Sequence, residues 1–316
     1  MTPKASTARV AVVTVTYHPE PGMLERQFAA LPSDGLVVLV DKQSGAAEVA
    51  NLQALAARRA DTHLILNPSN AGLASALNQG VRYVAATDTS REFVLLMDQD
   101  SEPHPGSIGQ LLESMLRLEE AGESVGCVGP RLVDNATGLQ HGFHCMGRWR
   151  WFRRFPKQGS SEPISCANLN GSGTMVRTKL FLDLGGLDES LFIDHVDTEW
   201  AFRVLAAGHA LFGIPQATFN HGMGERGLRF WWFGWRVWPQ RAPMRHYYLF
   251  RNTVSLWARD YVPRVWKAWS AAKLALTMMI NGVFGPRRIA QMQSMLRGVL
   301  DGRRTAALWR KDASLG

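Results

Sequence analysis

The chain has 316 residues, of which 46% are hydrophobic and 20% are charged. This length and balance can bury one substantial core with an additional segment, and they exclude a disordered or fibrous protein. The charge is unevenly distributed: residues 1–221 carry 18 basic and 23 acidic side chains, whereas residues 222–316 carry 17 basic and 4 acidic ones. Eight of the eleven tryptophans also follow residue 221. We therefore expect a main domain over residues 1–221 and a basic, Trp-rich extension over residues 222–316.

The extension combines positive charge with large amphipathic rings, as the surfaces of peripheral membrane proteins often do. Nucleic acid is the competing partner for such charge. Residues 1–9 lack the charged start and apolar centre of a secretory signal peptide. The longest apolar run, residues 268–284, is interrupted by Lys273 and Asn281 and is shorter than the roughly 20 residues of a membrane span. The three cysteines are widely spaced and suit a reducing compartment. The sequence therefore predicts a cytoplasmic protein that contacts the membrane from its surface.

Short apolar stretches alternate with helical patterns in the first part of the chain. Strands are predicted at residues 10–16, 36–40, 63–66, 93–97 and 126–129. Helices are predicted at residues 22–31, 73–84 and 108–121. This alternation predicts an α/β protein with a mixed, mainly parallel sheet flanked by helices. Ligands of such open sheets bind beyond the carboxyl ends of the strands, so we expect the functional side chains directly after each strand.

The second part of the main domain is less regular. Residues 148–158 are basic and aromatic, and we expect them to form a mobile loop. The other predicted elements are a strand at 167–177, a helix at 178–184, a turn at 185–188, a helix at 198–207 and a short strand at 217–220. The extension is expected to be mostly helical.

Two carboxylates, Asp98 and Asp100, follow the apolar strand predicted at residues 93–97. Strand alternation points both side chains in the same direction, toward the edge of the sheet that receives ligand. Two acids aimed at one point repel each other unless a cation lies there, and hard oxygen ligands suit Mg2+ or Mn2+. Such an ion would bridge a diphosphate and neutralise the charge on a leaving nucleotide. The alternative, a solvated turn, is disfavoured by the preceding strand.

A second acidic group, Asp194, Asp197 and Glu199, begins a helix that continues through Arg203. Acids at a helix N-terminus often serve only as caps, which stabilise by about 0.5–2 kcal/mol. Three acids within six residues are more than capping requires. Asp197 is the best candidate for a carboxylate that accepts the proton of an acceptor hydroxyl as its oxygen attacks a sugar.

A phosphate-binding helix N-terminus is predicted where Asn70 and Gly72 precede a helix that contains Asn78. The N-terminus offers free N–H groups, and Gly72 allows the backbone to approach a ligand closely. An ordinary capped helix is the equally supported alternative.

Two further candidates lie later in the main domain. His221 follows the last predicted strand, where it is either a structural histidine or a third metal ligand. Gly171 and Ser172 belong to a Gly-Ser-Gly stretch that lacks the third glycine of a dinucleotide loop. We expect a tight turn there, in the half of the domain that faces the acceptor.

Taken together, these stretches resemble the family 2 glycosyltransferases of the GT-A fold, and among them bacterial rhamnosyltransferases of the rhamnolipid and O-antigen type. The similarity covers about residues 10–221. It rests on residues 13–17, 70–80, 95–101 and 191–199, of which the last two stretches are the most specific. Residues 245–252 also resemble a segment that follows the catalytic core in these rhamnosyltransferases.

The resemblance implies a metal site and a catalytic base. Asp98 and Asp100 match the family's metal and diphosphate motif, with Gln99 at the middle position, where many members carry another acid. Asp197 matches the catalytic base. In galactofuranosyl relatives a histidine about two dozen residues beyond the base completes the metal site, and His221 has that spacing.

The resemblance also implies how substrates are bound. Asp41 matches the position that recognises the nucleotide base, and Thr16 and Tyr17 match the wall beside the nucleotide. Gly171 and Ser172 belong to the region that lines the acceptor side. The remaining residues expected to contact substrate are Asn70, Gly72, Asn78, Gln99, Asp194, Glu199 and Arg203.

The activity implied is metal-dependent, inverting transfer of L-rhamnose from dTDP-L-rhamnose to a glycolipid or lipid-linked saccharide, with Mg2+ or Mn2+ as cofactor. A UDP- or GDP-linked donor used in polysaccharide assembly is the alternative. A nucleotidyltransferase would share the sheet and the acid pair, but it should carry a Gly-rich loop with Arg or Lys after the first strand, which residues 14–19 lack. A nucleic-acid binder would not need two acidic clusters, so no nucleic-acid partner is expected.

Overall fold

The structure, a computed structural model, describes residues 6–134, 137–157, 159–222, 227–231 and 235–313. The chain divides into two compact units. The first unit comprises residues 1–145, 152–192 and 196–222. The second unit comprises residues 146–151, 193–195 and 223–316. Two short internal segments therefore belong with the C-terminal part of the chain.

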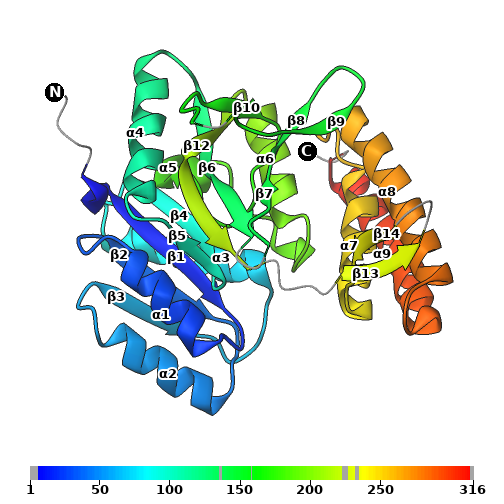
Figure 1. Cartoon of the computed structure of the whole chain (residues 1–316), viewed down its shortest axis with the longest axis horizontal. Coiled ribbons are helices and arrows are strands. Elements are labelled where there is room, and N and C mark those ends of the chain that lie inside the picture. The colour runs from blue at the N-terminus through cyan, green and yellow to red at the C-terminus, as the bar shows by residue number, and fades with distance from the viewer. Residues whose placement is uncertain (1–5, 135–136, 158, 223–226, 232–234, 314–316) are drawn as a thin grey trace. The chain divides into compact units, whose positions relative to one another are not determined.

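The first unit is built on one large sheet with the strand order β10-β12-β6-β11-β4-β1-β2-β3 (Figure 1). Four neighbouring strands are parallel, namely β1 (Val10–Thr16), β2 (Leu36–Asp41), β3 (Thr62–Leu66) and β4 (Phe93–Asp98). Thr16 lies opposite Asp41, and Val15 lies opposite Asp98. The last residues of β1, β2 and β4 therefore meet at one edge of the sheet, as the sequence predicts.

The other half of the sheet mixes strand directions. It contains β5 (Ser101–Pro103), β6 (Val125–Asp134), β7 (Gln140–His141), β10 (Ile164–Cys166), β11 (Thr174–Arg177) and β12 (Ala210–His221). Strand β11 is antiparallel to both β4 and β6, while β12 is parallel to β6. The end of β12 pairs with β5, so that His221 lies opposite Ser101. This pairing brings the end of β12 to the turn that follows β4.

Helices cover both faces of this sheet (Figure 1). One face packs against α1 (Pro21–Ala30), α2 (Ala46–Ala56) and α4 (Ser107–Glu120). The other packs against α3 (Leu73–Thr87), α5 (Thr178–Asp183) and α6 (Val196–Ala206). Alternation along β1 explains this division, because Val10 and Val12 point to the first face while Ala11 and Val13 point to the second. The predicted α/β class with flanking helices is confirmed. Two single 3-10 turns, Thr7–Arg9 and Glu189–Leu191, complete the unit.

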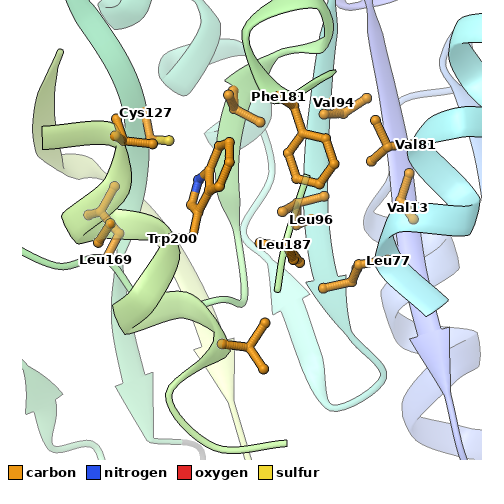
Figure 2. Packing of buried hydrophobic residues seen from close by; sticks show 14 of the residues in the cluster. Val13, Leu77, Val81, Val94, Leu96, Cys127, Leu169, Phe181, Leu187 and Trp200 are labelled. Atoms are coloured by element: carbon orange, nitrogen blue, oxygen red, sulfur yellow. The ribbon is translucent and has the colours of Figure 1, made fainter. Parts of the chain in front are cut away.

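Aromatic side chains anchor the helices to the second face (Figure 2). The rings of Phe181 on α5 and Trp200 on α6 lie 5.0 Å apart and are 1% and 3% exposed. Val94 and Leu96 of β4 belong to the same buried cluster. Burying a side chain of this size stabilises the fold by about 1.5–3 kcal/mol. The helix that carries Asp197 is therefore fixed to the sheet by its own apolar face.

The second unit is a set of three helices with a short hairpin. Its elements are β13 (Gly227–Trp231), β14 (Trp235–Pro239), α7 (Pro243–Leu256), α8 (Arg264–Val283) and α9 (Arg288–Ala313). Helices α7 and α9 approach closely because α9 has glycines at the contact: a Cβ on Gly298 would lie 2.5 Å from the carbonyl oxygen of Tyr247. Phe250, Leu274 and Met295 form its buried core. No helix in the described part of the chain combines the length and apolar character needed to cross a bilayer.

Three expectations about secondary structure need correction. The strand predicted at 167–177 is limited to β11, because Gly173 turns the chain with a φ of 84°. The loop predicted at 148–158 contains a strand, β9 (Trp151–Arg154), which pairs with β8 (Phe143–Met146); Gln158 lies outside the described residues. Helix α2 and the β13–β14 hairpin are not among the predicted elements.

Candidate active site

The turn after β4 is held by a buried glutamine that the sequence analysis does not single out. Gln27 on α1 donates from its Nε2 to the carbonyl oxygens of Asp98 (2.8 Å) and Ser101 (2.6 Å). Its Oε1 accepts a hydrogen bond from the Thr14 hydroxyl at 3.0 Å. Since Gln27 is fully buried, its hydrogen bonds from α1 fix the backbone that carries Asp98 and Asp100. A lone glutamine in an amphipathic helix gives no sequence signal for this role.

A chain of polar contacts links the acid pair to the end of β12. The Ser172 hydroxyl accepts from the backbone N–H of Asp98 at 3.2 Å and hydrogen-bonds to the Ser101 hydroxyl. The Ser101 hydroxyl also lies 2.8 Å from Nδ1 of His221. The same Nδ1 lies 3.4 Å from Oδ1 of Asp100. The structure therefore brings together three predicted residues, Asp100, Ser172 and His221, around a fourth that sequence reasoning missed, Ser101.

Asp197 lies in the first turn of α6, where its carboxylate is bound by backbone N–H groups. Oδ1 accepts from the N–H of Thr198 at 2.8 Å, and Oδ2 accepts from the N–H of Gly171 at 3.3 Å. Burial raises the pKa of Asp197 to about 6, the two backbone hydrogen bonds oppose that rise, and the negative charge of Asp98 adds to it. A carboxyl with a pKa near neutrality can both accept and release a proton.

The two acidic groups predicted from the sequence are joined by one dipeptide. Gly171 donates to Asp197, and its neighbour Ser172 accepts from Asp98. A Cβ at Gly171 would lie 3.7 Å from the Cβ of Asp197, an ordinary van der Waals distance, so these two residues are in direct contact without the contact requiring glycine. The four segments that carry Asp98, Ser172, Asp197 and His221 thus form one polar site on the first unit.

The predicted nucleotide wall is organised around a buried carboxylate. Asp41 accepts from the Thr16 hydroxyl (2.9 Å), the Ser44 hydroxyl (2.6 Å) and the Ser44 N–H (2.7 Å). Asp41 is 1% exposed. These three hydrogen bonds occupy most of the roughly four acceptor positions of its carboxylate. Thr16 and Asp41 therefore fix the turn that follows β2.

Tyr17 and Gln99 are bound to each other across the sheet edge. Oε1 of Gln99 accepts from the Tyr17 N–H at 2.7 Å, and its Nε2 donates to the Tyr17 carbonyl at 3.2 Å. The Tyr17 side chain is 43% exposed, and the ammonium of Lys42 lies 5.4 Å from the centre of its ring. The structure thus presents an aromatic ring beside a cation at this edge.

The N-terminus of α3 is shaped by Asn70 and Gly72. The Asn70 side chain accepts from the Gly72 N–H at 3.0 Å. Gly72 has a φ of 99°, and a Cβ there would lie 2.7 Å from the carbonyl oxygen of Phe192. That carbonyl also accepts from the Leu73 N–H at 2.6 Å. The N–H of Leu73, the first residue of α3, is therefore already hydrogen-bonded within the protein. The close approach of Phe192 requires glycine at position 72.

Three predicted substrate contacts are engaged with other protein groups. Asn78, 2% exposed, bonds through its side chain to both the N–H and the carbonyl of Leu187. Glu199, 1% exposed, forms two hydrogen bonds with Arg203 on the next turn of α6. The structure does not bring these three side chains to the site around Asp197.

Asp194 belongs to the second unit. Burial opposes its charge, but the hydrogen bonds from Arg245 and the positive charge of Arg241 outweigh burial and hold the pKa of Asp194 below its ordinary value. Both arginines lie within 3.0 Å of its carboxylate. Asp194 and His195 have positive φ values of 62° and 63°, and the Asn252 side chain donates to the Asp194 carbonyl at 2.8 Å. The 245–252 segment noted in the sequence thus holds a strained stretch of backbone.

Of the residues predicted to bind a divalent metal, Asp100 and His221 offer atoms that could serve as ligands. Oδ1 of Asp100 is buried and accepts no hydrogen bond from the described residues, although Nδ1 of His221 is nearby. If Nδ1 carries the proton shared with Ser101 or Asp100, Nε2 of His221 holds the lone pair that a metal requires. Among the described residues, no three His, Cys, Asp or Glu side chains converge as a complete metal site would require.

Known proteins share both the sequence pattern and the fold. A sequence model of glycosyl transferase family 2 matches residues 15–185. The dTDP-rhamnosyl transferase RfbF of Shigella flexneri is 29% identical over 257 residues, covering 81% of this chain and 82% of the relative. The N-acetylglucosaminyl-diphospho-decaprenol L-rhamnosyltransferase of Mycobacterium tuberculosis is 27% identical over 233 residues, covering 66% of this chain and 75% of the relative.

Two solved structures show the same architecture at low identity. GalNAc-T7 with UDP, GalNAc and Mn2+ has a TM-score of 0.56 and 15% identity; the match covers 87% of this chain but spans only 57% of that one. The mannosyltransferase PcManGT of Pyrobaculum calidifontis, in complex with GDP-Man and Mn2+, has a TM-score of 0.54 and 17% identity, with 97% and 80% coverage. These likenesses confirm the predicted GT-A fold. The family match covers more than half of the chain and includes the acid pair, Gly171 and Ser172, so this protein is a glycosyltransferase and belongs to glycosyl transferase family 2.

Proposed function

We propose that this enzyme transfers L-rhamnose from dTDP-L-rhamnose to a glycolipid or lipid-linked saccharide, with inversion at the anomeric carbon. The choice of sugar is supported by the two relatives, both of which are named as rhamnosyltransferases. The observation that carries the chemistry is the carboxylate of Asp197, whose raised pKa and link through Gly171 and Ser172 to Asp98 suit a general base beside a diphosphate.

In the proposed reaction Asp197 accepts the proton of an acceptor hydroxyl. The oxygen of that hydroxyl forms a bond to the anomeric carbon on the face opposite the diphosphate. The bond from this carbon to the diphosphate oxygen breaks, and its electron pair leaves with the nucleotide. A single displacement of this kind inverts the configuration of the anomeric carbon. The backbone N–H groups of Gly171 and Thr198 keep the carboxylate oriented while its charge changes.

Asp98, Asp100 and His221 would hold a divalent ion, Mg2+ or Mn2+. When bound, such an ion neutralises the charge that develops on the leaving diphosphate. One or two carboxylates suffice at such sites, because substrate phosphates and water supply the remaining ligands. Ser101 and Ser172 set the position of His221 and of the Asp98 backbone.

The nucleotide would lie along the edge formed by β1, β2 and β4. Tyr17 offers an exposed ring for the base, and Lys42 beside it adds positive charge. Because Asp41 is almost fully buried, it acts in this proposal chiefly by holding Thr16 and Ser44, with one acceptor position left for the base. Asn70 and Gly72 shape the start of α3 beside this edge.

The basic extension would contact the cytoplasmic surface of the inner membrane, where a lipid-linked acceptor is found. Its 17 basic and 4 acidic side chains favour anionic lipid, each basic residue near such a surface contributing about 1 kcal/mol. The large hydrophobic side chains of α8 and α9 that remain exposed, including Met279, Ile289 and Leu300, add apolar area for the interface.

A donor screen tests the proposal. Wild-type protein is incubated with Mn2+, a lipid-linked saccharide acceptor and dTDP-L-rhamnose, or with UDP- or GDP-sugars in place of the rhamnose donor. Mass spectrometry of the product identifies the sugar, and NMR identifies its anomeric configuration. Transfer from dTDP-L-rhamnose with inversion is expected, whereas preferential transfer from a UDP- or GDP-sugar would replace the proposed donor. Asp197→Asn should abolish transfer, and Asp183→Asn, at an exposed position of α5, serves as the matched control.

A further inference from the structure

A cavity of about 530 Å3 lies within the second unit, between α7, α8 and α9. Phe250 and Val254 line it from α7, Leu274 and Met278 from α8, and Val299 from α9. Cavities of 300–1,000 Å3 with mainly apolar walls are typical of sites for small ligands. All of its lining residues belong to the second unit, whereas Asp197 and the residues bonded to it belong to the first.

Two arginines add positive charge to the lining of this mainly apolar cavity. Arg303 and Arg310 are spaced seven residues apart on α9, which places them on the same side of the helix. The small side chains of Ala306 and Ala307 lie between them and also line the cavity. Both arginines are exposed, and neither makes an ion pair or side-chain hydrogen bond with a residue that the structure describes. By contrast, the adjacent Arg304 pairs with Asp301 at 3.1 Å.

The combination of apolar side chains and two arginines indicates which class of ligand the cavity would bind. An uncharged hydrocarbon would gain nothing from two arginines, and a small anion would gain nothing from a wall of apolar side chains. An acyl or isoprenoid chain removes its own surface and that of the wall from water, which contributes about 0.8 kcal/mol per buried methylene. A phosphate on such a lipid can accept charge-assisted hydrogen bonds from guanidinium groups, whose fork geometry matches its oxygens.

We propose that this cavity binds the hydrocarbon chain of a phosphate-bearing lipid, with the phosphate against Arg303 and Arg310. That lipid is the carrier of the saccharide acceptor, and this identification rests on the proposed function. The extension would then select acceptors by their lipid part, in addition to contacting the membrane as a surface.

Isothermal titration of the full chain with dodecyl phosphate, below its micelle concentration, tests the site. Butyl phosphate carries the same head with a chain too short to fill the cavity, and dodecanol carries the chain without the charge. We expect dodecyl phosphate to bind, butyl phosphate to bind at least ~100-fold more weakly because most buried methylenes are lost, and dodecanol ~10-fold more weakly. Equal binding of butyl and dodecyl phosphate would mean that the arginines bind phosphate alone, and the proposal would be wrong.

Two substitutions locate the binding within the protein. Ala307→Phe fills the cavity from an exposed position and should weaken dodecyl phosphate binding ~10-fold or more, while Ala272→Phe, exposed on α8 outside the cavity, should not. Arg303→Gln and Arg310→Gln should each weaken binding by ~10-fold, with Arg288→Gln, another exposed arginine of α9, as control. Unchanged affinity in Ala307→Phe would overturn the assignment of the cavity.

The titration contains no nucleotide sugar, so its result is separate from the choice of donor. If dodecyl phosphate binds as expected but no rhamnose is transferred, the cavity stands and the proposed reaction fails. If rhamnose is transferred equally well to acceptors with long and short chains while dodecyl phosphate does not bind, the reaction stands and the cavity proposal fails.

Discussion

The side-chain amide of Gln99 bonds to both the N–H and the carbonyl of Tyr17, and so ties the end of β1 to the turn that follows β4. An acidic residue at this position could accept from the N–H of Tyr17 but could not donate to its carbonyl. Gln99 therefore links the two strand ends without adding a third negative charge to Asp98 and Asp100.

Replacing Gln99 by alanine should weaken donor binding more than it slows turnover. Both hydrogen bonds to Tyr17 are lost, each contributing about 1 kcal/mol, and the exposed ring at the proposed nucleotide edge is left less ordered. We expect KM for the donor to rise about tenfold with kcat within twofold of wild type. Steady-state kinetics with varied donor measure this, with Gln53→Ala on the exposed side of α2 as control. A fall in kcat at constant KM would instead place Gln99 in the chemical step.

Asp197→Asn should remove activity and at the same time stabilise the donor-free protein above pH 6. The folded-state pKa of Asp197 is raised to about 6 from 3.8, so the folded protein binds a proton more readily than the unfolded chain between these values. Wild-type stability therefore declines as pH rises from about 4 to 6, and the ionised carboxyl remains a cost above that range. The asparagine has no such cost, and we expect a gain of the order of 1 kcal/mol at pH 8.

Thermal unfolding of both proteins from pH 4 to pH 8 measures the difference. The gain should shrink to nothing as pH falls below about 4, where the wild-type carboxyl is protonated in both states. In the wild-type enzyme kcat/KM should fall below about pH 6 with a slope of one, because that parameter reports the free enzyme's essential base. A stability difference independent of pH would contradict the assigned titration.

His221→Gln should raise the concentration of Mn2+ required for activity. The imidazole contacts Ser101 and lies 3.4 Å from the buried Oδ1 of Asp100, so its removal takes away the proposed third ligand and the group beside that acid. We expect the activation constant for Mn2+ to increase 10- to 100-fold. His209→Gln, whose ring contacts Ser124 elsewhere in the first unit, provides the control. Activity that survives chelation of all divalent ions in the wild-type enzyme would exclude this role.

The Asp194–Arg245 pair should show strong coupling in a double-mutant cycle. Arg245→Gln removes two of the hydrogen bonds to a carboxylate that is 7% exposed, and the guanidinium of Arg241 remains beside it. Breaking one partner of a buried pair is costly because a charge is left uncompensated. We expect a loss of about 2 kcal/mol for Arg245→Gln and at least half of that recovered in Asp194→Asn/Arg245→Gln, measured by urea unfolding. Additive effects of the two substitutions would mean that the pair is not coupled.

The elements that the sequence predicted well are those whose patterns are local. β1, β2 and β4 are continuous β-branched or leucine-rich runs, and Asp41, Asp98 and Asp197 follow from their places after such runs or before an amphipathic helix. Helix α2 could not be recognised because its alanine-rich surface leaves only Leu52 and Leu55 buried. The late start of the strand predicted at 167–177 depends on Gly173, where a Cβ would lie 2.6 Å from the ring of Pro130 in another strand.

The supporting residues of the site were harder to predict than the acids. Gln27 and Ser101 act through contacts with backbone and side chains that lie far away in sequence, such as the 120-residue separation between Ser101 and His221. Asn78, Glu199 and Arg203 are conspicuous in the sequence, yet the contacts they make are with other protein groups. A polar residue type alone does not distinguish a group that faces substrate from one that holds a loop.

The pairing of β12 with β6 and β5 also determines when the polar site can form during translation. His221 reaches Ser101 only through these pairings, and β12 is the last strand of the large sheet to leave the ribosome. The parallel strands β1 to β4 can form earlier, but they leave the edge of β6 open until then. A nascent chain that pauses before residue 210 therefore carries the acid pair and Ser172 but not His221, and the enzyme cannot acquire its complete polar site before β12 is synthesised.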